Sequence, residues 1–272
     1  MQAVVERLLE QLSDPVLLTG VAQVAAAGAL AAIVVGISRF RGLALERELG
    51  VALARGLVQI VAMGSIVGIL LTVDLVWSGL VLLFMMGGAT WISKERGEGL
   101  PGVVRVSFVA IALGSGLVIV TMTLAGAIEA TVRNLVPVGS MIIANAMQIN
   151  SLALDRFKGE IASNRAEIEA GLALGAPPAA VISRHVETGV RASLIPVVDS
   201  LKSLGWVWIP GIMAGMILGG ENPIYAALYQ FVIMAMIFGA GGLTSMTSSL
   251  LIGKYVFTEA EQLKEIEDGE GA

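Results

Sequence analysis

The polar side chains that could contact a solute lie inside long apolar stretches of this sequence. Arg55 and Gln59 are one helical turn apart, so on a helix they share a face that could line a pathway or bind an anion. Arg55 could instead extend its guanidinium group to lipid headgroups, because it is near the end of its apolar run. Asn145, Gln148 and Asn150 form a second cluster, which could line a cavity or hydrogen-bond between helices.

Two further groups lie in the C-terminal half. Asp199 and Lys202 are three residues apart, so they could form an ion pair on one helix face or contact a substrate. Pro210 and Gly211 interrupt an apolar run, and such a break either exposes carbonyl groups beside a transported substrate or acts as a hinge. We expect the ion pair and the hinge. Met213 follows the break and is one of 12 methionines, whose thioethers suit Cu(I) better than iron but also serve as ordinary packing.

The residue types that are missing exclude most catalytic chemistry. The chain has no cysteine, and its single histidine, His185, lies in a polar segment outside the apolar runs. The only Gly-Lys pair, Gly253-Lys254, has Ser248 where a phosphate-binding loop needs its first glycine. We therefore expect no catalytic site and no cofactor bound by this chain, and we expect no nucleic-acid partner. No metal ligands can be named from the sequence.

The composition places these residues in a membrane protein. Hydrophobic residues make up 56% of the 272 residues and charged residues only 14%, against about 25% charged in an ordinary soluble domain. Runs without charge, each long enough to cross a hydrocarbon core of about 30 Å, predict an all-α polytopic protein with about seven transmembrane helices. The helices form one permease domain over 1–272, with spans at 15–38, 49–73, 75–93, 106–128, 134–154, 203–220 and 222–253.

Basic residues predict the orientation of the spans. Arg39, Arg41 and Arg47 lie between the first two spans, whereas the segment after the second span carries Asp74 alone. This alternation continues along the chain, so the positive-inside rule places the N-terminus outside and the C-terminus in the cytoplasm, in the inner (plasma) membrane. Residues 1–14 predict a short helix lying on the outer lipid surface, and 259–270 predict a solvated acidic tail.

The one long segment between spans, 155–202, predicts a helical finger in the cytoplasm. A helix over 158–174 should stop at Gly175, and Pro177-Pro178 should begin a second helix that ends before Pro196. The run Glu169-Ala170-Gly171, three residues and then Gly175 resembles the EAA signature of bacterial ABC-transporter permeases, although Pro196 lies further downstream than in that signature. The resemblance implies a coupling helix that docks on an ATPase, with its contacts at Glu169, Ala170, Gly171, Gly175, Ala176, Pro177 and Pro178.

Longer blocks over 39–255 resemble the FetB (YbbM) family of permeases. They include Arg55-Gly-Leu-Val-Gln59, Asn145-Ala-Met147, Asp199-Ser-Leu-Lys202 and Ile209-Pro-Gly-Ile-Met213, with departures at Ser140, Ile143 and Ala144. The resemblance implies a permease linked to iron export or aluminium tolerance. It also implies a separate ABC ATPase subunit that binds ATP and magnesium, and a second copy of the chain in a 2+2 complex. The candidate translocation pathway is then Arg55, Gln59, Asn145, Met147, Gln148, Asp199, Lys202, Pro210, Gly211 and Met213.

The resulting prediction is the membrane subunit of an ATP-driven exporter of iron, another metal or a small polar solute. A secondary transporter driven by an ion gradient is the alternative, and a protonatable residue in the middle of a span would favour it. A membrane-embedded enzyme would need a nucleophile and base or a metal cluster at depth, which one histidine cannot supply.

Overall fold

The computed structural model describes residues 15–42, 46–70 and 75–265, and over these ranges the regular elements are α-helices. Within the same ranges, pairing outside the helices is limited to two isolated bridges, Leu204 with Trp208 and Phe257 with Leu263. The predicted all-α class is therefore confirmed for the described chain. The chain divides between Ile69 and Leu70 into two units, which are described separately. The helix predicted over residues 1–14 lies outside the described residues.

The first unit contains α2 (Pro15–Phe40) and α3 (Glu46–Leu70). Proline suits the first turn of α2 because it has no amide hydrogen that would need a partner there. Almost every described side chain of α2 is exposed within the unit, although the helix is apolar on all sides. Such a helix is stable only where lipid or another protein surface covers it, as expected of a membrane span.

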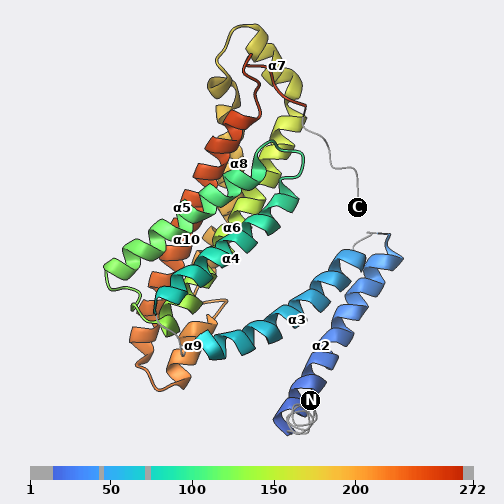
Figure 1. Ribbon diagram of the computed structural model, residues 1–272. Helices are drawn as coiled ribbons and strands as arrows, with labels where there is room; N and C mark the ends of the chain where they lie inside the picture. The colour runs from blue at the N-terminus through green and yellow to red at the C-terminus, as the bar shows by residue number, and fades with distance from the viewer. Residues whose placement is uncertain (1–14, 43–45, 71–74, 266–272) are drawn as a thin grey trace. The chain divides into compact units, whose positions relative to one another are not determined.

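The second unit is a bundle of long helices with a short helix near each end (Figure 1). α10 packs against α5, α6 and α8, and α6 also packs against α4 and α5. Short α7 lies at one end of the bundle and short α9 at the other (Figure 1). The helices are α4 (Leu75–Arg96), α5 (Val103–Leu124), α6 (Val132–Ser163), α7 (Arg165–Ala173), α8 (Pro178–Ser203), α9 (Gly211–Leu218) and α10 (Pro223–Tyr255).

Five of the described helices are long and apolar enough to cross a membrane, namely α2, α4, α5, α6 and α10. They correspond to the predicted spans 15–38, 75–93, 106–128, 134–154 and 222–253. α6 continues beyond its predicted end to Ser163, so the first helix of the finger is not the separate helix predicted over 158–174. Asn164 separates α6 from α7, and its Nδ2 donates a hydrogen bond to Glu160 O at 2.8 Å.

The predicted span over residues 203–220 does not form one continuous helix. The chain turns after Ser203, where Gly205 has a φ of 74° and its amide donates to Trp208 O at 2.9 Å. The 8 residues of α9 that follow cover about 12 Å, too short for a hydrocarbon core of about 30 Å. α8 instead runs back along the bundle, and it continues through Pro196, where the sequence predicted its end. Val197, the residue after Pro196, is only 6% exposed, and its burial in the core stabilises the helix across the proline.

Two clusters of buried apolar side chains hold the second unit together. The central cluster includes Leu82, Ile111, Ile142, Val197, Ile233 and Ile237. The finger cluster includes Phe157, Ile161, Ile168, Ile182, Ile252 and Leu263. α5, α6, α8 and α10 each contribute to both clusters, so four helices connect the two packed regions.

α5 and α10 approach each other closely at Gly114. A Cβ atom on Gly114 would lie 2.7 Å from the carbonyl oxygen of Ala240 and 2.8 Å from the amide nitrogen of Thr244. Both obstacles are backbone atoms, so a larger residue would force the two helices apart. Close contact through small residues is the usual way in which membrane helices gain packing energy.

Candidate functional site

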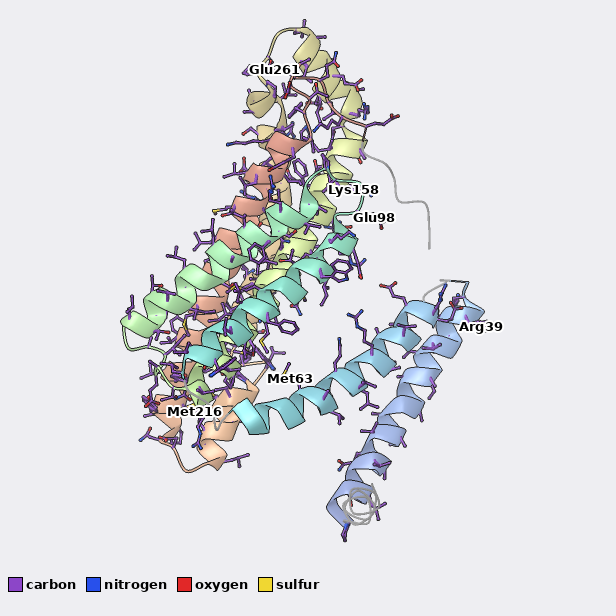
Figure 2. All side chains as sticks on the ribbon, viewed as in Figure 1. Arg39, Met63, Glu98, Lys158, Met216 and Glu261 are labelled. Atoms are coloured by element: carbon purple, nitrogen blue, oxygen red, sulfur yellow. The ribbon has the colours of Figure 1, made fainter. Side chains whose placement is uncertain are left out.

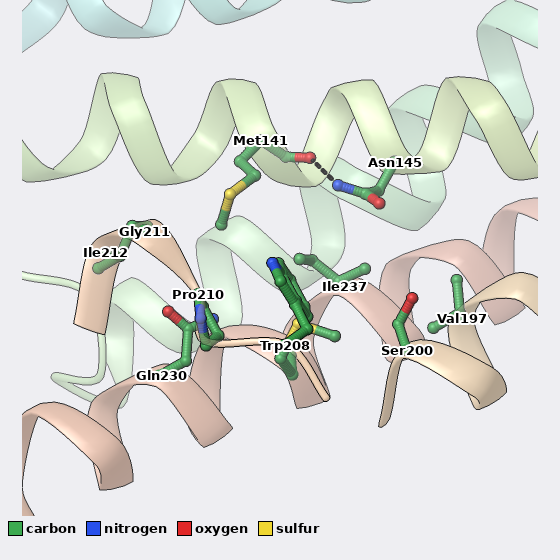
Figure 3. A pocket seen from close by; sticks show the side chains of 11 residues that line it. Met141, Asn145, Val197, Ser200, Trp208, Pro210, Gly211, Ile212, Gln230 and Ile237 are labelled. Carbon is green, nitrogen blue, oxygen red and sulfur yellow. Dashed lines mark hydrogen bonds between the residues drawn. The ribbon is translucent and has the colours of Figure 1, made fainter. Parts of the chain in front are cut away.

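A cavity of about 250 Å³ lies where α6, α8 and α10 meet the loop of residues 204–210, which connects α8 to α9 (Figure 3). The loop supplies Trp208 and Pro210, Gly211 begins α9, and α6 supplies Asn145. Three residues predicted for the pathway, Asn145, Pro210 and Gly211, are thus brought together in one site. The remaining lining comes from Met141, Val197, Ser200, Ile212, Gln230, Met234 and Ile237.

The loop of residues 204–210 forms one wall of the cavity, and its own residues explain why the helix is interrupted there. Gly205 adopts the left-handed backbone conformation that side-chain-bearing residues avoid. Pro210 precedes α9 with an extended backbone, since proline in a helix interior would remove a hydrogen bond and clash with the preceding turn. The predicted interruption at Pro210 and Gly211 is therefore real, and it lies beside the cavity.

Gln230 is the cavity residue with an unsatisfied polar group. Its side chain is 3% exposed, and its Oε1 has no hydrogen-bond partner among the described residues. By contrast, Asn145 Nδ2 donates to Met141 O at 2.9 Å, and Ser200 Oγ donates to Pro196 O at 2.9 Å. Figure 3 shows Gln230 on the α10 side of the cavity. A buried acceptor without a partner costs about 1–3 kcal/mol, so this position favours a ligand or water that donates a hydrogen bond.

Sequence reasoning did not select Gln230 as a pathway residue. The available signal was its type, because an amide in the middle of a long apolar run is expensive unless it is paired or functional. The other residues that line the cavity come mainly from α6, α8 and the loop of residues 204–210. No spacing rule within α10 connects Gln230 to those segments.

Four other polar or sulfur-bearing candidates of the second unit lie outside the cavity. Gln148 is exposed on α6, and Met147 is half-buried beside it, with its carbonyl accepting a hydrogen bond from Ser93. Met213 is half-buried in α9 but does not line the cavity. Asn150 is fully buried, and its Nδ2 donates a hydrogen bond to Ser107 Oγ of α5 at 3.0 Å. A hydrogen bond between helices is one of the two roles predicted for this residue.

The charged candidates of the second unit, Asp199 and Lys202, also do not line the cavity. Asp199 and Lys202 form the predicted i,i+3 ion pair at 3.4 Å, with side chains 62% and 71% exposed. Arg55 and Gln59 belong to α3 of the first unit, where both side chains are exposed within that unit. Their one-turn spacing on a single helix is confirmed, whereas their role in a pathway stays a prediction.

Buried hydroxyl groups follow α10 between the cavity and the finger cluster. Thr244, Ser245, Ser248 and Ser249 are each at most 1% exposed. The hydroxyls of Ser245 and Ser193 share a hydrogen bond of 2.7 Å between α10 and α8. The other three hydroxyl oxygens have no side-chain or backbone partner within the described ranges. This polar row makes α10 a helix that packs through protein rather than one that faces lipid on every side.

The helical hairpin made by α7, the turn at 174–177 and the start of α8 has the turn geometry that the sequence predicted. Gly175 has a φ of 83°, its amide donates to Leu172 O at 2.9 Å, and the Ala176 amide donates to Gly171 O at 3.1 Å. These two bonds are the Schellman pattern that ends a helix at a left-handed glycine. Pro178 then occupies the first turn of α8. The stop at Gly175 and the restart at Pro178 are confirmed, and a cytoplasmic location stays a prediction.

The hairpin is packed onto the bundle by its buried face. Ile168 of α7 is 0% exposed and Ile182 of α8 is 5% exposed, and both belong to the finger cluster with Ile252 of α10. A Cβ on Gly171 would lie 3.2 Å from Val181 Cγ2, so this glycine allows α7 to lie against α8. Because packed interiors transmit strain, a force on the hairpin reaches the ends of α6 and α10.

The outer face of the hairpin is open. Ala170 and Pro177 are exposed, and Leu174 at the turn is 90% exposed. Glu169 is half exposed and forms an ion pair with Arg165 at 2.8 Å. These side chains are therefore available to a partner, while the opposite face of the hairpin is used in packing.

The chain after α10 folds back onto the hairpin as a strap, residues 256–265. Lys264 Nζ donates to Tyr255 O at 2.9 Å, and the carbonyl of Lys264 accepts from Arg165 of α7 at 3.3 Å. Leu263 is 8% exposed and belongs to the finger cluster. Residues 259–262 of the predicted solvated tail are exposed, as predicted, whereas Leu263 is buried and anchors the strap.

His185, the single histidine of the sequence, lies at the base of the hairpin. It is 6% exposed, and its Nδ1 is 3.2 Å from Glu160 Oε2. This pair joins α8 to α6. Within the described ranges, no three His, Cys, Asp or Glu side chains lie close enough to hold a metal ion.

Known proteins similar to this chain cover most of its length. A family model described as "Uncharacterised protein family (UPF0014)" matches residues 21–257. "UPF0014 membrane protein STAR2" of Oryza sativa subsp. japonica is 30% identical over 249 residues, 91% of this chain and 87% of the relative. "Protein ALUMINUM SENSITIVE 3" of Arabidopsis thaliana is 30% identical over 250 residues, 92% of each chain. "Probable iron export permease protein FetB" of Escherichia coli (strain K12) is 29% identical over 235 residues, 86% of this chain and 91% of the relative. No solved structure matches the chain.

Proposed function

Because the chain belongs to the uncharacterised protein family UPF0014 and is a multi-pass membrane permease of the ABC type, we propose that it is the membrane subunit of an ATP-driven exporter. The cargo is iron, another metal or a small polar solute, and the relative named as an iron export permease supports the first of these. ATP and magnesium would bind to a separate ATPase subunit, since the sequence holds no phosphate-binding loop. Two copies of the chain and two ATPases would complete the transporter.

The observation that carries this proposal is the shared packing of the hairpin and the bundle. Ile168 and Ile182 of the hairpin lie in one cluster with Phe157 of α6 and Ile252 of α10. An ATPase that pushed on the exposed turn would displace a packed core rather than a free loop. ABC transporters need such a connection, because ATP hydrolysis and substrate movement occur in different subunits.

α10 provides a direct path from the hairpin to the cavity. Its Ile252 belongs to the finger cluster, and its Gln230 lines the cavity about 33 Å away along the same continuous helix. α8 makes a second connection through Ile182 and Val197, which lie in the finger and central clusters. A rigid displacement of either helix therefore changes the walls of the cavity.

The charge distribution of the second unit supports a cytoplasmic hairpin. Basic residues gather at the hairpin end, where Lys158 Nζ donates to Glu98 O at 2.8 Å in the turn between α4 and α5 (Figure 2). Within the described ranges, the opposite end carries only two basic residues, Arg133 and Lys202 at the end of α8, together with Glu129, Asp199 and Glu221. The positive-inside rule then places the hairpin and the C-terminus in the cytoplasm of a cell with the protein in its plasma membrane.

The cavity favours a cargo that does not need charged ligands. Its described lining consists of amide, hydroxyl, thioether, indole and aliphatic groups, without a carboxylate, lysine or histidine. Neutral groups of this kind poorly replace the water around a bare multivalent cation. A polar solute, or a metal already held by its own ligands, is the better fit. A proton-driven transporter would need a titratable group here, so this lining does not favour the proton-driven form of the ion-gradient alternative.

Flux into sealed vesicles tests the proposal. The chain is reconstituted with a candidate ABC ATPase subunit, sought first in the neighbouring reading frames, and uptake of ferrous iron, an iron chelate and a neutral polar solute is measured with and without ATP. We expect ATP-dependent flux of at least one cargo. We also expect Gly175→Trp and Glu169→Arg to uncouple ATP hydrolysis from flux without preventing membrane insertion. ATP-independent flux driven by a proton or sodium gradient would contradict the proposal.

A further inference from the structure

We propose that the strap and the hairpin together form a docking cleft for a basic, partly apolar segment of the ATPase, an inference that rests on the proposed function. The cleft has a volume of about 530 Å³. Glu169, Ala173 and Gly175 of the hairpin line one side, and Ala260 and Glu261 of the strap line the other. The two sides are far apart in the sequence, so the cleft exists only because the strap returns to the hairpin.

The strap is a folded wall with its own internal hydrogen bonds. The Lys264 amide donates to Val256 O at 2.8 Å, and the Thr258 amide donates to Gln262 O at 2.8 Å. Lys264 Nζ binds the carbonyl of Tyr255 at the end of α10, where the helix dipole favours a cation. A wall that is already ordered loses little conformational entropy when a partner docks.

Carboxylates dominate the charge around the cleft. Glu169 lies on the hairpin side and Glu261 on the strap side, and Glu167 and Glu259 are exposed on the same two segments. Figure 2 shows Glu261 at the hairpin end of the second unit. Of the nearby cations, Arg165 pairs with Glu169 and Lys264 Nζ is bound to a carbonyl. The surface therefore repels anionic lipid headgroups and attracts a basic protein segment.

Exposed apolar side chains next to the carboxylates provide a second surface that the docking segment could contact. Leu174 is 90% exposed at the turn, directly before Gly175 in the cleft wall, and Ala173 is exposed beside it. A docking segment that placed an aliphatic side chain on Leu174 and a lysine or arginine between Glu169 and Glu261 would satisfy both features. Burial of an apolar contact surrounded by complementary charge is the usual composition of a tight interface.

Binding measurements on the full-length chain in detergent test the cleft. The probe is the candidate ABC ATPase subunit used in the flux experiment, and its Kd is measured for the unmodified chain, Glu261→Lys, Ala173→Trp and Glu98→Lys. Lysine at position 261 reverses the charge on the strap, and tryptophan at position 173 fills the cleft without changing charge. Glu98→Lys is the matched control, because Glu98 is exposed at the same end of the bundle but does not line the cleft.

We expect Glu261→Lys and Ala173→Trp each to weaken binding about tenfold or more, and Glu98→Lys to change it less than twofold. We also expect the Kd of the unmodified chain to rise with salt, and that of Glu261→Lys to rise less steeply. Equal binding by Glu261→Lys, Ala173→Trp and the unmodified chain would overturn the docking cleft while leaving the proposed function intact. An equal loss in Glu98→Lys would also overturn it, because the effect would then be general. Failure of the unmodified chain to bind the ATPase would overturn the proposed function itself.

Discussion

Replacing Gln230 with leucine should stabilise the protein while reducing transport. Gln230 Oε1 is buried in the cavity without a partner among the described residues, and an unpaired buried acceptor costs about 1–3 kcal/mol. Leucine has a similar volume and no polar group, so it should recover much of that free energy of folding. The same change removes the acceptor that would bind a polar cargo, so flux should fall even as stability rises.

Two measurements on the same preparation separate these effects. Thermal unfolding followed by tryptophan fluorescence reports the change in stability, and Trp208 provides a probe in the cavity wall. ATP-dependent flux in vesicles reports transport. Gln148→Leu is the matched control, because Gln148 is the same residue type on the exposed side of α6. We expect the control to leave both the unfolding midpoint and the flux close to those of the unmodified chain.

The opposite pattern would refute the reasoning about Gln230. A lower unfolding midpoint with normal flux would mean that the amide makes a structural hydrogen bond in the folded protein. A lower midpoint with lost flux would mean that leucine disturbs the fold of the cavity. Only a midpoint that is unchanged or raised, together with reduced flux, agrees with a buried acceptor that serves the cargo.

Three other substitutions test separate features. At Gly175 a Cβ would meet no atom within 4 Å, but a φ of 83° costs an L-residue about 1–2 kcal/mol, so Gly175→Ala and Gly175→Trp should lower the unfolding midpoint equally. Only the tryptophan variant should also block ATP-coupled flux, and equal flux in both would contradict the docking role of the turn. Gly114→Leu should destabilise the α5–α10 contact by about 1–3 kcal/mol, measured as a lower midpoint, whereas Gly87→Leu, which faces open space, should not. Asp199→Ala should change stability by less than about 0.5 kcal/mol and leave flux normal, because its ion pair is mostly exposed, and lost flux would return Asp199 to the pathway.

Most of the helices could be predicted because an apolar segment in lipid has few ways other than a helix to satisfy its polar backbone. A run without charge must satisfy its amides and carbonyls internally, so α2, α4, α5, α6 and α10 follow from hydropathy alone. The same rule failed at 203–220, because an apolar turn and an apolar helix contain equally few charges. It also missed α8 as the return helix, since its charged residues interrupt the hydropathy signal although one face is buried.

The hairpin could be predicted because its signals are local. A left-handed glycine at position 175 and a proline at position 178 act within a few residues of themselves. The strap could not be predicted, because its anchor, Leu263, is buried by the finger cluster and not by its own neighbours in the chain. Its acidic composition correctly indicated charge but not where that charge would lie.

From the sequence alone follow the membrane class, the family resemblance, the placement of most spans and the turn of the hairpin, since these depend on composition and on contacts within one helical turn. Only the tertiary structure decided which polar groups share a site. Gln230, Asn145 and Pro210 line one cavity because α10, α6 and the loop of residues 204–210 pack around it. Gln148, one helical turn from Asn145, is instead exposed. Rules based on spacing within a helix cannot distinguish these outcomes, because burial of a side chain is set by segments distant in the chain.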